Sequence, residues 1–225
     1  MLRGDSEPHR PPPHFTFPMK LLNCRPFCFA PVLLATAALW AAVPAARTLT
    51  IKPVEEKVPA VQITVDGARI RVVVGNELLL SGETKDGQKR RYSGKDGVFA
   101  AEVKMGEPDG FKVRTQAGKL LWKIKTADAK TKVSDNEENK GGYEMARKRG
   151  VVRVVKDEQL LGTFEFGPAV EAGGSGATRI KDPNGRVLFT AEPAGGSLAG
   201  GVMLMTAVPV ELRYIIMAEL LARSY

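Results

Sequence analysis

The sequence predicts a mainly β protein: an antiparallel β-barrel, built of hairpins, around a hydrophobic C-terminal α-helix. Three observations support this prediction. Apolar and polar residues alternate through most of the chain after residue 60, which is the pattern of half-buried strands. Turn sequences such as Asp66-Gly67 separate the alternating runs at short intervals. One largely apolar helical segment follows at the end, and a helix that is apolar on all sides is usually buried on all sides.

The first part of the chain is predicted to be an export signal. Met19–Ala46 has a basic start with Lys20 and Arg25, an apolar run over residues 31–43, and small residues that suit cleavage. The run is shorter than the roughly 20 residues of a spanning helix. An uncleaved amphipathic or core helix is the alternative. Residues 1–18 are predicted to be disordered, or untranslated if translation starts later. The protein is therefore expected to be exported, either periplasmic or secreted.

The rest of the chain excludes several chemistries. Without residues 1–46, 179 residues with a net charge of +6 remain, enough for one hydrophobic core. Cys24, Cys28 and both histidines lie outside this part, so it holds no disulfide, no thiol or Ser-His nucleophile and no zinc site of ordinary ligands. The apolar run follows Cys24 where a lipoprotein signal would place it before, so lipidation is not expected.

The barrel is expected to occupy residues 61–225, after an irregular lead-in or edge strand at residues 47–60. Polar residues 128–142 are predicted to form a loop between two halves, and the glycine-containing segments 168–176 and 194–201 to be flexible or loose. The predicted strands cover residues 61–65, 68–74, 77–83, 88–93, 98–105, 111–115, 119–125, 143–148, 151–155, 160–166, 177–180 and 186–191.

Two pairs of hairpin segments resemble each other in sequence. Residues 71–80 are similar to 153–161, and residues 113–122 are similar to 180–189. A duplicated set of hairpins would explain the similarity, and so would the general likeness of one hairpin to another. Both explanations agree with a β protein.

The C-terminal segment is predicted to be a helix over residues 209–223. Pro209 suits a first helical position, and no glycine or second proline follows. Burying its six large apolar side chains would contribute on the order of 10–15 kcal/mol before entropy is counted. Four charged residues argue against a membrane span and are spread over about 200° of the helical wheel: Glu211, Arg213, Glu219 and Arg223.

A sheet system that encloses a terminal helix resembles the tubby-like fold, which includes the scramblase and LURP-one-related proteins. The strand pairs of that family carry segments similar to Val113–Trp122 and Ile180–Phe189, with apolar residues before a glycine turn and two apolar residues and an aromatic after it. The resemblance covers roughly residues 63–223. It implies a β-barrel around a C-terminal helix. Because some tubby-like domains bind phosphoinositides, it also implies anionic lipid as a ligand class.

Two basic clusters are the candidate binding residues. They are candidates for contact with an anionic lipid headgroup or another polyanion. Charged side chains at strand edges also prevent aggregation between sheets, and this alternative stays open. The clusters consist of Lys89, Arg90 and Arg91, and of Arg147, Lys148 and Arg149.

Other polar motifs are expected to be structural. Residues 134–139 lack the alternating acids and central glycine of a calcium loop, so a solvated loop is predicted. The glycine-rich segments 173–176 and 195–196 lack the Lys-Ser/Thr that completes a phosphate-binding loop, so linkers are predicted. No catalytic residue, metal site or cofactor is predicted.

These observations favour a non-catalytic exported domain with a binding or structural role. Its candidate partners are an anionic lipid or a cell-envelope protein, and nucleic acid is not expected. One alternative is an envelope interaction module with a different β fold, such as a sandwich. Another is a hydrolase that uses two carboxylates about 5–10 Å apart.

Overall fold

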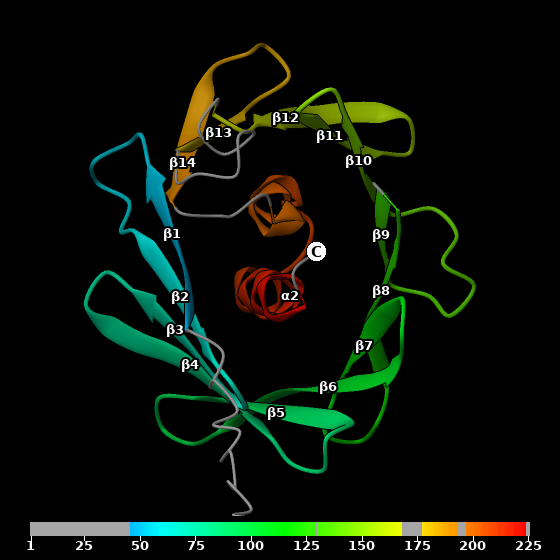
Figure 1. Ribbon diagram of the computed structural model, residues 1–225. Helices are drawn as coiled ribbons and strands as arrows, with labels where there is room; N and C mark the ends of the chain where they lie inside the picture. Colours follow the sequence, from blue (N-terminus) through cyan, green and yellow to red (C-terminus); the bar gives the residue numbers. More distant parts are fainter. Residues whose placement is uncertain (1–45, 129, 168–176, 193–196, 224–225) are drawn as a thin grey trace, which may run out of the picture. The chain divides into compact units, whose positions relative to one another are not determined.

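A computed structural model describes residues 46–128, 130–167, 177–192 and 197–223. Within these residues, fourteen antiparallel strands close into one barrel, in which each strand pairs with its neighbours in sequence and β1 pairs with β14 (Figure 1). The predicted fold class is therefore confirmed. The sandwich alternative is wrong, because the sheet closes on itself. The predicted leader and export signal lie outside the described residues, apart from Ala46.

The strands follow the predicted hairpins closely. They are β1 Arg47–Pro53, β2 Val61–Asp66, β3 Arg69–Val74, β4 Glu77–Thr84, β5 Lys89–Gly94, β6 Phe99–Glu107, β7 Gly110–Arg114, β8 Leu120–Ala127, β9 Lys130–Ser134, β10 Tyr143–Lys148, β11 Val151–Lys156, β12 Gln159–Glu165, β13 Thr178–Lys181 and β14 Val187–Glu192.

Alternation along each strand determines which side chains fill the barrel. In β2, Val61, Ile63 and Val65 are buried, whereas Gln62 is exposed and Thr64 is half-buried. Successive side chains of a strand point to opposite faces, so one apolar set faces the interior and the polar set faces solvent. The same pattern in the other strands produces one continuous core.

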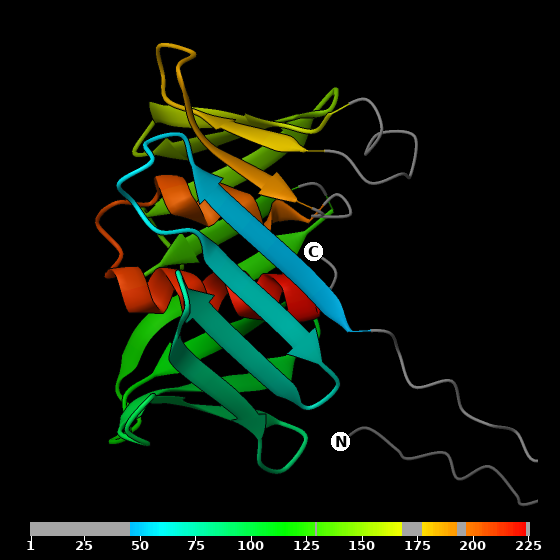
Figure 2. The ribbon, with the colours of Figure 1, turned by 90° about the vertical axis from the view of Figure 1, so that its left-hand side faces the viewer.

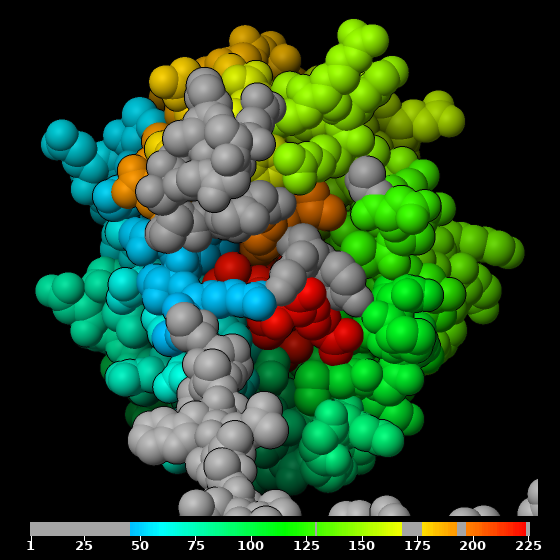
Figure 3. All heavy atoms as spheres, viewed as in Figure 1, coloured from blue at the N-terminus to red at the C-terminus, as the bar shows by residue number. Residues whose placement is uncertain are grey.

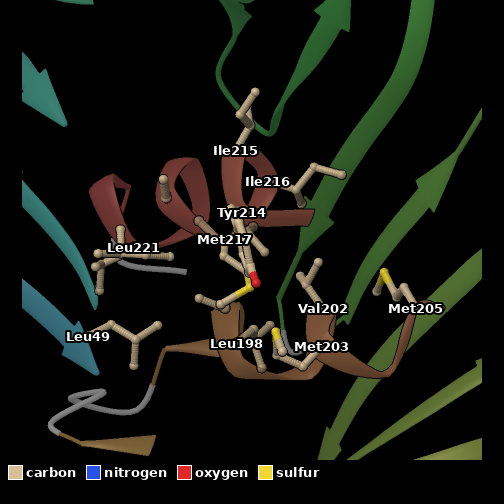
Figure 4. Close-up of a cluster of buried hydrophobic side chains, with 14 of the residues drawn as sticks. Leu49, Leu198, Val202, Met203, Met205, Tyr214, Ile215, Ile216, Met217 and Leu221 are labelled. Carbon is tan, nitrogen blue, oxygen red and sulfur yellow. The ribbon is translucent and has the colours of Figure 1, made fainter. Parts of the chain in front are cut away.

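Two helical segments occupy the middle of the barrel: the 3₁₀-helix η1 (Leu198–Leu204) and the α-helix α2 (Val210–Ala222) (Figures 1 and 2). Every residue of η1 and every residue of α2 from Tyr214 to Leu221 is buried. In Figure 4, Tyr214 and Met217 of α2 point toward η1. The prediction of an enclosed C-terminal helix is therefore confirmed, with Pro209 as its extended N-cap and not its first helical residue.

The lead-in predicted for residues 47–60 is wrong over its first half. β1 is paired on both sides, with β2 and with β14, so it is neither irregular nor at an edge. Leu49 and Ile51 are buried. With only these two alternating apolar residues before Pro53, however, the sequence shows too weak an alternation to predict a strand. The pairing with β14 joins residues about 140 positions apart, for instance Thr50 with Glu192, which local sequence patterns do not reveal.

Two further segments also differ from their prediction. Residues 130–134 of the predicted loop form β9, in which Thr131 and Val133 are buried; a threonine in place of an apolar residue hides the alternation. Residues 198–201 of the segment predicted to be loose belong to the buried helix η1. There Gly201 lies so close to Met145 that a Cβ atom would stand 2.7 Å from the methionine sulfur. Close packing, and not flexibility, accounts for this glycine.

The barrel has two different ends, which Figure 2 shows on its left and right sides. We call the end on the left the bulged end; its turns cover residues 54–60, 75–76, 95–98, 115–119, 135–142, 157–158 and 182–186. We call the other the basic end; β1 begins there, and its turns include residues 67–68, 85–88, 108–109 and 149–150. α2 begins at the bulged end and finishes at the basic end, where its atoms fill the centre of the ring (Figure 3).

Candidate functional site

Five hairpins carry a β-bulge beside their turn at the bulged end. In each, the pairing register skips one residue of the second strand of the hairpin. The skipped residues are half-buried and pack against the core. A bulge bends its strand and re-aims side chains, so strict alternation does not apply to this set. We call it the apolar collar, and it consists of Leu79, Ala100, Leu121, Leu161 and Leu188.

The bulges explain the repeats in the sequence. In the first pair of similar segments the register shifts after Val72 and after Val154, which are equivalent positions. In the second pair it shifts after Val113 and after Ile180, again at equivalent positions. The β5–β6 hairpin has the same shift after Tyr92 without a matching repeat. The repeats therefore reflect a hairpin geometry that recurs around the barrel.

The exposed large apolar side chains of the described residues also lie at the bulged end, on two turns and at the first residue of α2. They are Val54, Val58, Val98 and Val210. Pockets of about 470, 440 and 310 Å³ open at the same end. Large apolar groups at the surface and concave pockets both mark interaction sites. The bulged end is therefore a candidate binding surface.

The 470 Å³ pocket lies between the β3–β4 and β5–β6 hairpins, and we call it the β4–β6 pocket. β5 pairs with β4 only from Leu80 to Thr84, so the preceding β4 residues Glu77–Leu79 have no strand neighbour on that side. Charged groups stand around the opening: Glu77 pairs with Lys95 at 3.5 Å, and Glu211 belongs to the first turn of α2. The apolar lining consists of Val74, Leu78, Leu79, Leu80, Val98, Phe99 and Ala100.

A buried charged cluster joins α2 to the barrel wall. Nη1 of Arg90 donates a hydrogen bond to Oε1 of Glu219 at 2.7 Å, and the hydroxyl of Tyr92 donates to the same oxygen at 2.8 Å. The Glu219 side chain is 0% exposed and that of Arg90 is 7% exposed. Nε of Arg223 lies 3.8 Å from the other carboxylate oxygen. Its guanidinium stacks on Phe111, 4.9 Å from the ring centre.

Electrostatics stabilise the charge states of this cluster. Burial, reinforced by the charge of Glu219, raises the pKa of Tyr92 well above its usual value, so the phenol remains a donor. Burial lowers the pKa of Arg90, but the Glu219 carboxylate outweighs it and the net pKa is raised. Buried ions are tolerated only where partners replace their hydration. The cluster is therefore suited to holding α2 in one rotational position.

The prediction is wrong for one of the six candidate binding residues. Arg90 is buried because alternation along β5 turns the middle residue of the Lys-Arg-Arg run into the barrel. Its neighbours face outward: Nζ of Lys89 lies 3.8 Å from a carboxylate oxygen of Glu102, and the guanidinium of Arg91 lies 5.3 Å from the ring centre of Phe99. Arg90 binds Glu219 and is not available to a lipid.

The second predicted cluster is exposed at the turn between β10 and β11. Arg147, Lys148 and Arg149 form no ion pair within the described part of the chain, and Arg147 stacks 4.4 Å from the ring centre of Phe166. The remaining five predicted residues therefore lie at the same end of the barrel, the basic end, but on opposite sides of the four strands β6–β9.

The oxygen-rich loop of residues 134–139 is closed by its own contacts. Oγ of Ser134 donates to Oδ1 of Asn139 at 2.6 Å, and Nδ2 of Asn136 donates to the carbonyl of Lys140 at 2.8 Å. Glu137 reaches across to β7, where it pairs with Lys112 at 3.0 Å and with Arg114 at 2.9 Å. Hydrogen bonds from these two cations lower the pKa of Glu137. The oxygen atoms of this loop therefore stabilise the loop and its contact with β7.

Sequence reasoning missed the buried cluster and the apolar collar. A signal for the cluster existed, since Glu219 and Arg223 stand on a helix without a wholly polar face, and a charge on such a helix requires a buried partner. The collar had only the weaker signal of two adjacent apolar residues after each turn.

Among the described residues no group of three or more His, Cys, Asp or Glu side chains could hold a metal ion. The glycine-rich segments 173–176 and 195–196 lie outside the described residues.

The helices in the described ranges are all too short or too polar to cross a membrane. No protein-family model, curated protein or solved structure matches the chain. Of the resemblance to the tubby-like fold, only the coarse architecture is confirmed: a closed, fourteen-stranded antiparallel β-barrel with a C-terminal helix.

Proposed function

We propose that this chain is a non-catalytic exported binding domain, tubby-like in fold, that rests its basic end on an anionic lipid surface. The observation that carries the proposal is the common location of the outward-facing basic residues. Lys89 and Arg91 on β5, and Arg147, Lys148 and Arg149 at the β10–β11 turn, belong to the same end of one barrel.

The direction of the chain supports this orientation. β1 begins at Arg47 at the basic end, and only three residues separate it from Val43, where the predicted apolar run stops. Three extended residues reach about 10 Å. This is close to the screening length of about 8–10 Å at physiological ionic strength. While the predicted signal still holds the apolar run in a membrane during export, that membrane would therefore lie within electrostatic range of the basic end.

The filled interior supports a surface role. Every residue of η1 and the central part of α2 are buried among the strands, so the interior is packed with protein side chains. Glu219 is the only buried carboxylate among the described residues, and it is bonded to Arg90 and Tyr92. This arrangement does not favour the carboxylate hydrolase as an alternative.

Vesicle sedimentation tests the proposal. The exported protein is mixed with vesicles of phosphatidylglycerol and phosphatidylcholine, or of phosphatidylcholine alone, in 50 and 300 mM salt. We expect binding to the anionic vesicles that weakens with salt. Replacing Arg147, Lys148 and Arg149 by glutamine is expected to reduce the partition coefficient roughly 100-fold, because each basic residue near such a surface contributes about 1 kcal/mol.

The matched control removes three exposed lysines from turns of the bulged end: Lys57, Lys119 and Lys140. The glutamine variant of these three has the same net charge as the test variant, so the comparison isolates the position of the charges. Equal binding of the two variants, or binding that ignores salt and lipid charge, would disprove the orientation.

A further inference from the structure

We propose that the β4–β6 pocket at the bulged end is a binding site for an extended peptide segment of a partner protein that carries aliphatic and basic side chains. The site lies at the opposite end of the barrel from the proposed lipid surface. It is therefore independent of the proposed function, and each can fail without the other.

The size and lining of the pocket suit aliphatic side chains. Its volume of about 470 Å³ falls within the range of roughly 300–1,000 Å³ that ligand sites have. Val98 at its rim is 68% exposed, the highest fraction among the exposed large apolar residues of the described chain. Leu79 and Ala100, two members of the apolar collar, form part of its wall. A partner that covers Val98 would remove apolar surface from water.

The strand edge beside the pocket suits a peptide in particular. Residues Glu77–Leu79 continue β4 beyond its last pair with β5, Leu80 with Gly94. An extended peptide can add to such an edge through main-chain hydrogen bonds, while its alternate side chains enter neighbouring pockets. The pocket adjoins this edge directly, since all three of these β4 residues line it.

The charges at the opening select the partner. Glu77 and Glu211 stand at the pocket with Lys95 as the single cation, so the opening has an excess of negative charge. The Glu77 and Lys95 side chains are 81% and 63% exposed, and an ion pair as exposed as theirs is weak and readily exchanged. The turns of the bulged end follow the same trend, with nine acidic and five basic residues over the ranges that define this end. A lysine or arginine in the peptide complements these acids, whereas an anionic membrane does not.

Methyl NMR of the exported protein with synthetic probes tests the site. The probes are a capped heptapeptide of alternating valine and lysine, its counterpart with glutamate for lysine, and a lysine peptide with N-methylated valines. We expect the lysine peptide to shift the methyl signals of Leu78, Leu79 and Val98 in a saturable manner. We expect the glutamate and N-methylated peptides to bind at least roughly tenfold more weakly, because one reverses the charge and the other removes main-chain donors.

Two pairs of variants locate the binding. Val98→Ser is expected to weaken binding of the lysine peptide about tenfold, because it removes an apolar contact without changing the charge. Val54→Ser, at an exposed valine beside another pocket of the same end, is expected to leave the affinity unchanged. Replacing Glu77 and Glu211 by glutamine is expected to abolish the preference for lysine over glutamate. The same replacement at Glu55 and Glu56 is expected to preserve it. All six substituted positions are exposed, and circular dichroism confirms that each variant folds.

Several results would overturn the proposal. Equal affinity for the lysine and glutamate peptides would disprove the charge selectivity. Equal effects of Val98→Ser and Val54→Ser would show that the peptide does not bind in the β4–β6 pocket. Shifts at Val98 caused by anionic vesicles and not by peptide would assign the bulged end to lipid. Loss of vesicle binding by the basic-end variant would not affect any of these measurements.

Discussion

The carboxylate of Glu219 on α2 accepts a hydrogen bond of 2.7 Å from the guanidinium of Arg90 on β5, inside the barrel wall. The two residues are 129 positions apart, so the bond connects the end of the chain to a strand from its first half. Apolar packing encloses α2 but is not directional. The ion pair is directional, and with Tyr92 on the same oxygen it determines which side of α2 faces β5.

Removing one member of this pair is expected to destabilise the protein strongly. Glu219→Gln leaves the Arg90 charge buried without a counter-charge, and such a loss typically lowers the free energy of unfolding by about 3–5 kcal/mol. Urea unfolding followed by circular dichroism measures the change. Glu211→Gln, on the exposed first turn of the same helix, is the control and is expected to change stability by less than about 0.5 kcal/mol.

A double substitution separates the cost of an uncompensated charge from the value of the pair. Arg90→Met combined with Glu219→Met replaces both ions by apolar side chains, which is often neutral or stabilising for a buried pair. We expect the double variant to be more stable than Glu219→Gln alone. A double variant that is less stable than the single one would show that α2 depends on the ion pair itself.

The Tyr92 hydroxyl is expected to contribute measurably to the same cluster. Tyr92→Phe keeps the buried ring but removes the donor to Glu219, and a hydrogen bond to a charged group contributes about 1.5–3 kcal/mol. The free energy of unfolding should fall by that amount in urea titrations at pH 7. Tyr214→Phe is the matched control, because no hydrogen bond from the Tyr214 hydroxyl is present within the described part of the protein. Equal losses in both variants would contradict the assigned role.

Most of the fold could be predicted from the sequence, because most strands show a local alternation of apolar and polar residues between turn sequences. The turn Asp66-Gly67 lies between the alternating runs of β2 and β3, and both strands lie where the pattern predicts them. β9 was missed because Thr131 occupies an interior position that the pattern expects to be apolar. The local pattern predicts only a lead-in for residues 47–60, because β1 pairs with β14, a strand about 140 residues away in the sequence.

The candidate sites were harder to predict, because they depend on where side chains point. The Lys-Arg-Arg run indicates three surface cations, but strand alternation places Arg90 in the interior and Lys89 and Arg91 outside. The β4–β6 pocket arises where two hairpins separate and two bulges add Leu79 and Ala100. The separation has no signature in one sequence, and the bulges have only the weak signal of two adjacent apolar residues after each turn.

The ion pairs of Glu137 predict a pH dependence of stability. The pKa of this carboxyl is lowered in the folded protein by hydrogen bonds from Lys112 and Arg114. Its stabilising contribution is therefore fully present above its usual pKa of 4.5 and is lost as the pH falls through the lowered value. The difference in urea midpoint between the protein and Glu137→Gln should be largest near pH 7 and should shrink toward pH 3. A difference that is constant with pH would contradict it.

The contact between β7 and β8 at the basic end predicts a specific effect for one glycine. A Cβ atom at Gly110 would overlap the carbonyl oxygen of Ile124, a backbone atom that cannot move aside without shifting β8. Gly110 also accepts a hydrogen bond of 3.0 Å from Arg223, so a shift there would disturb the end of α2. We expect Gly110→Ala to lower the free energy of unfolding by about 1–3 kcal/mol. Gly106→Ala, in β6 with no atom within 4 Å of its Cβ position, should change it by less than about 0.5 kcal/mol. Thermal and urea unfolding of the two variants measure this contrast, and equal stabilities would show that β7 and β8 can separate without loss.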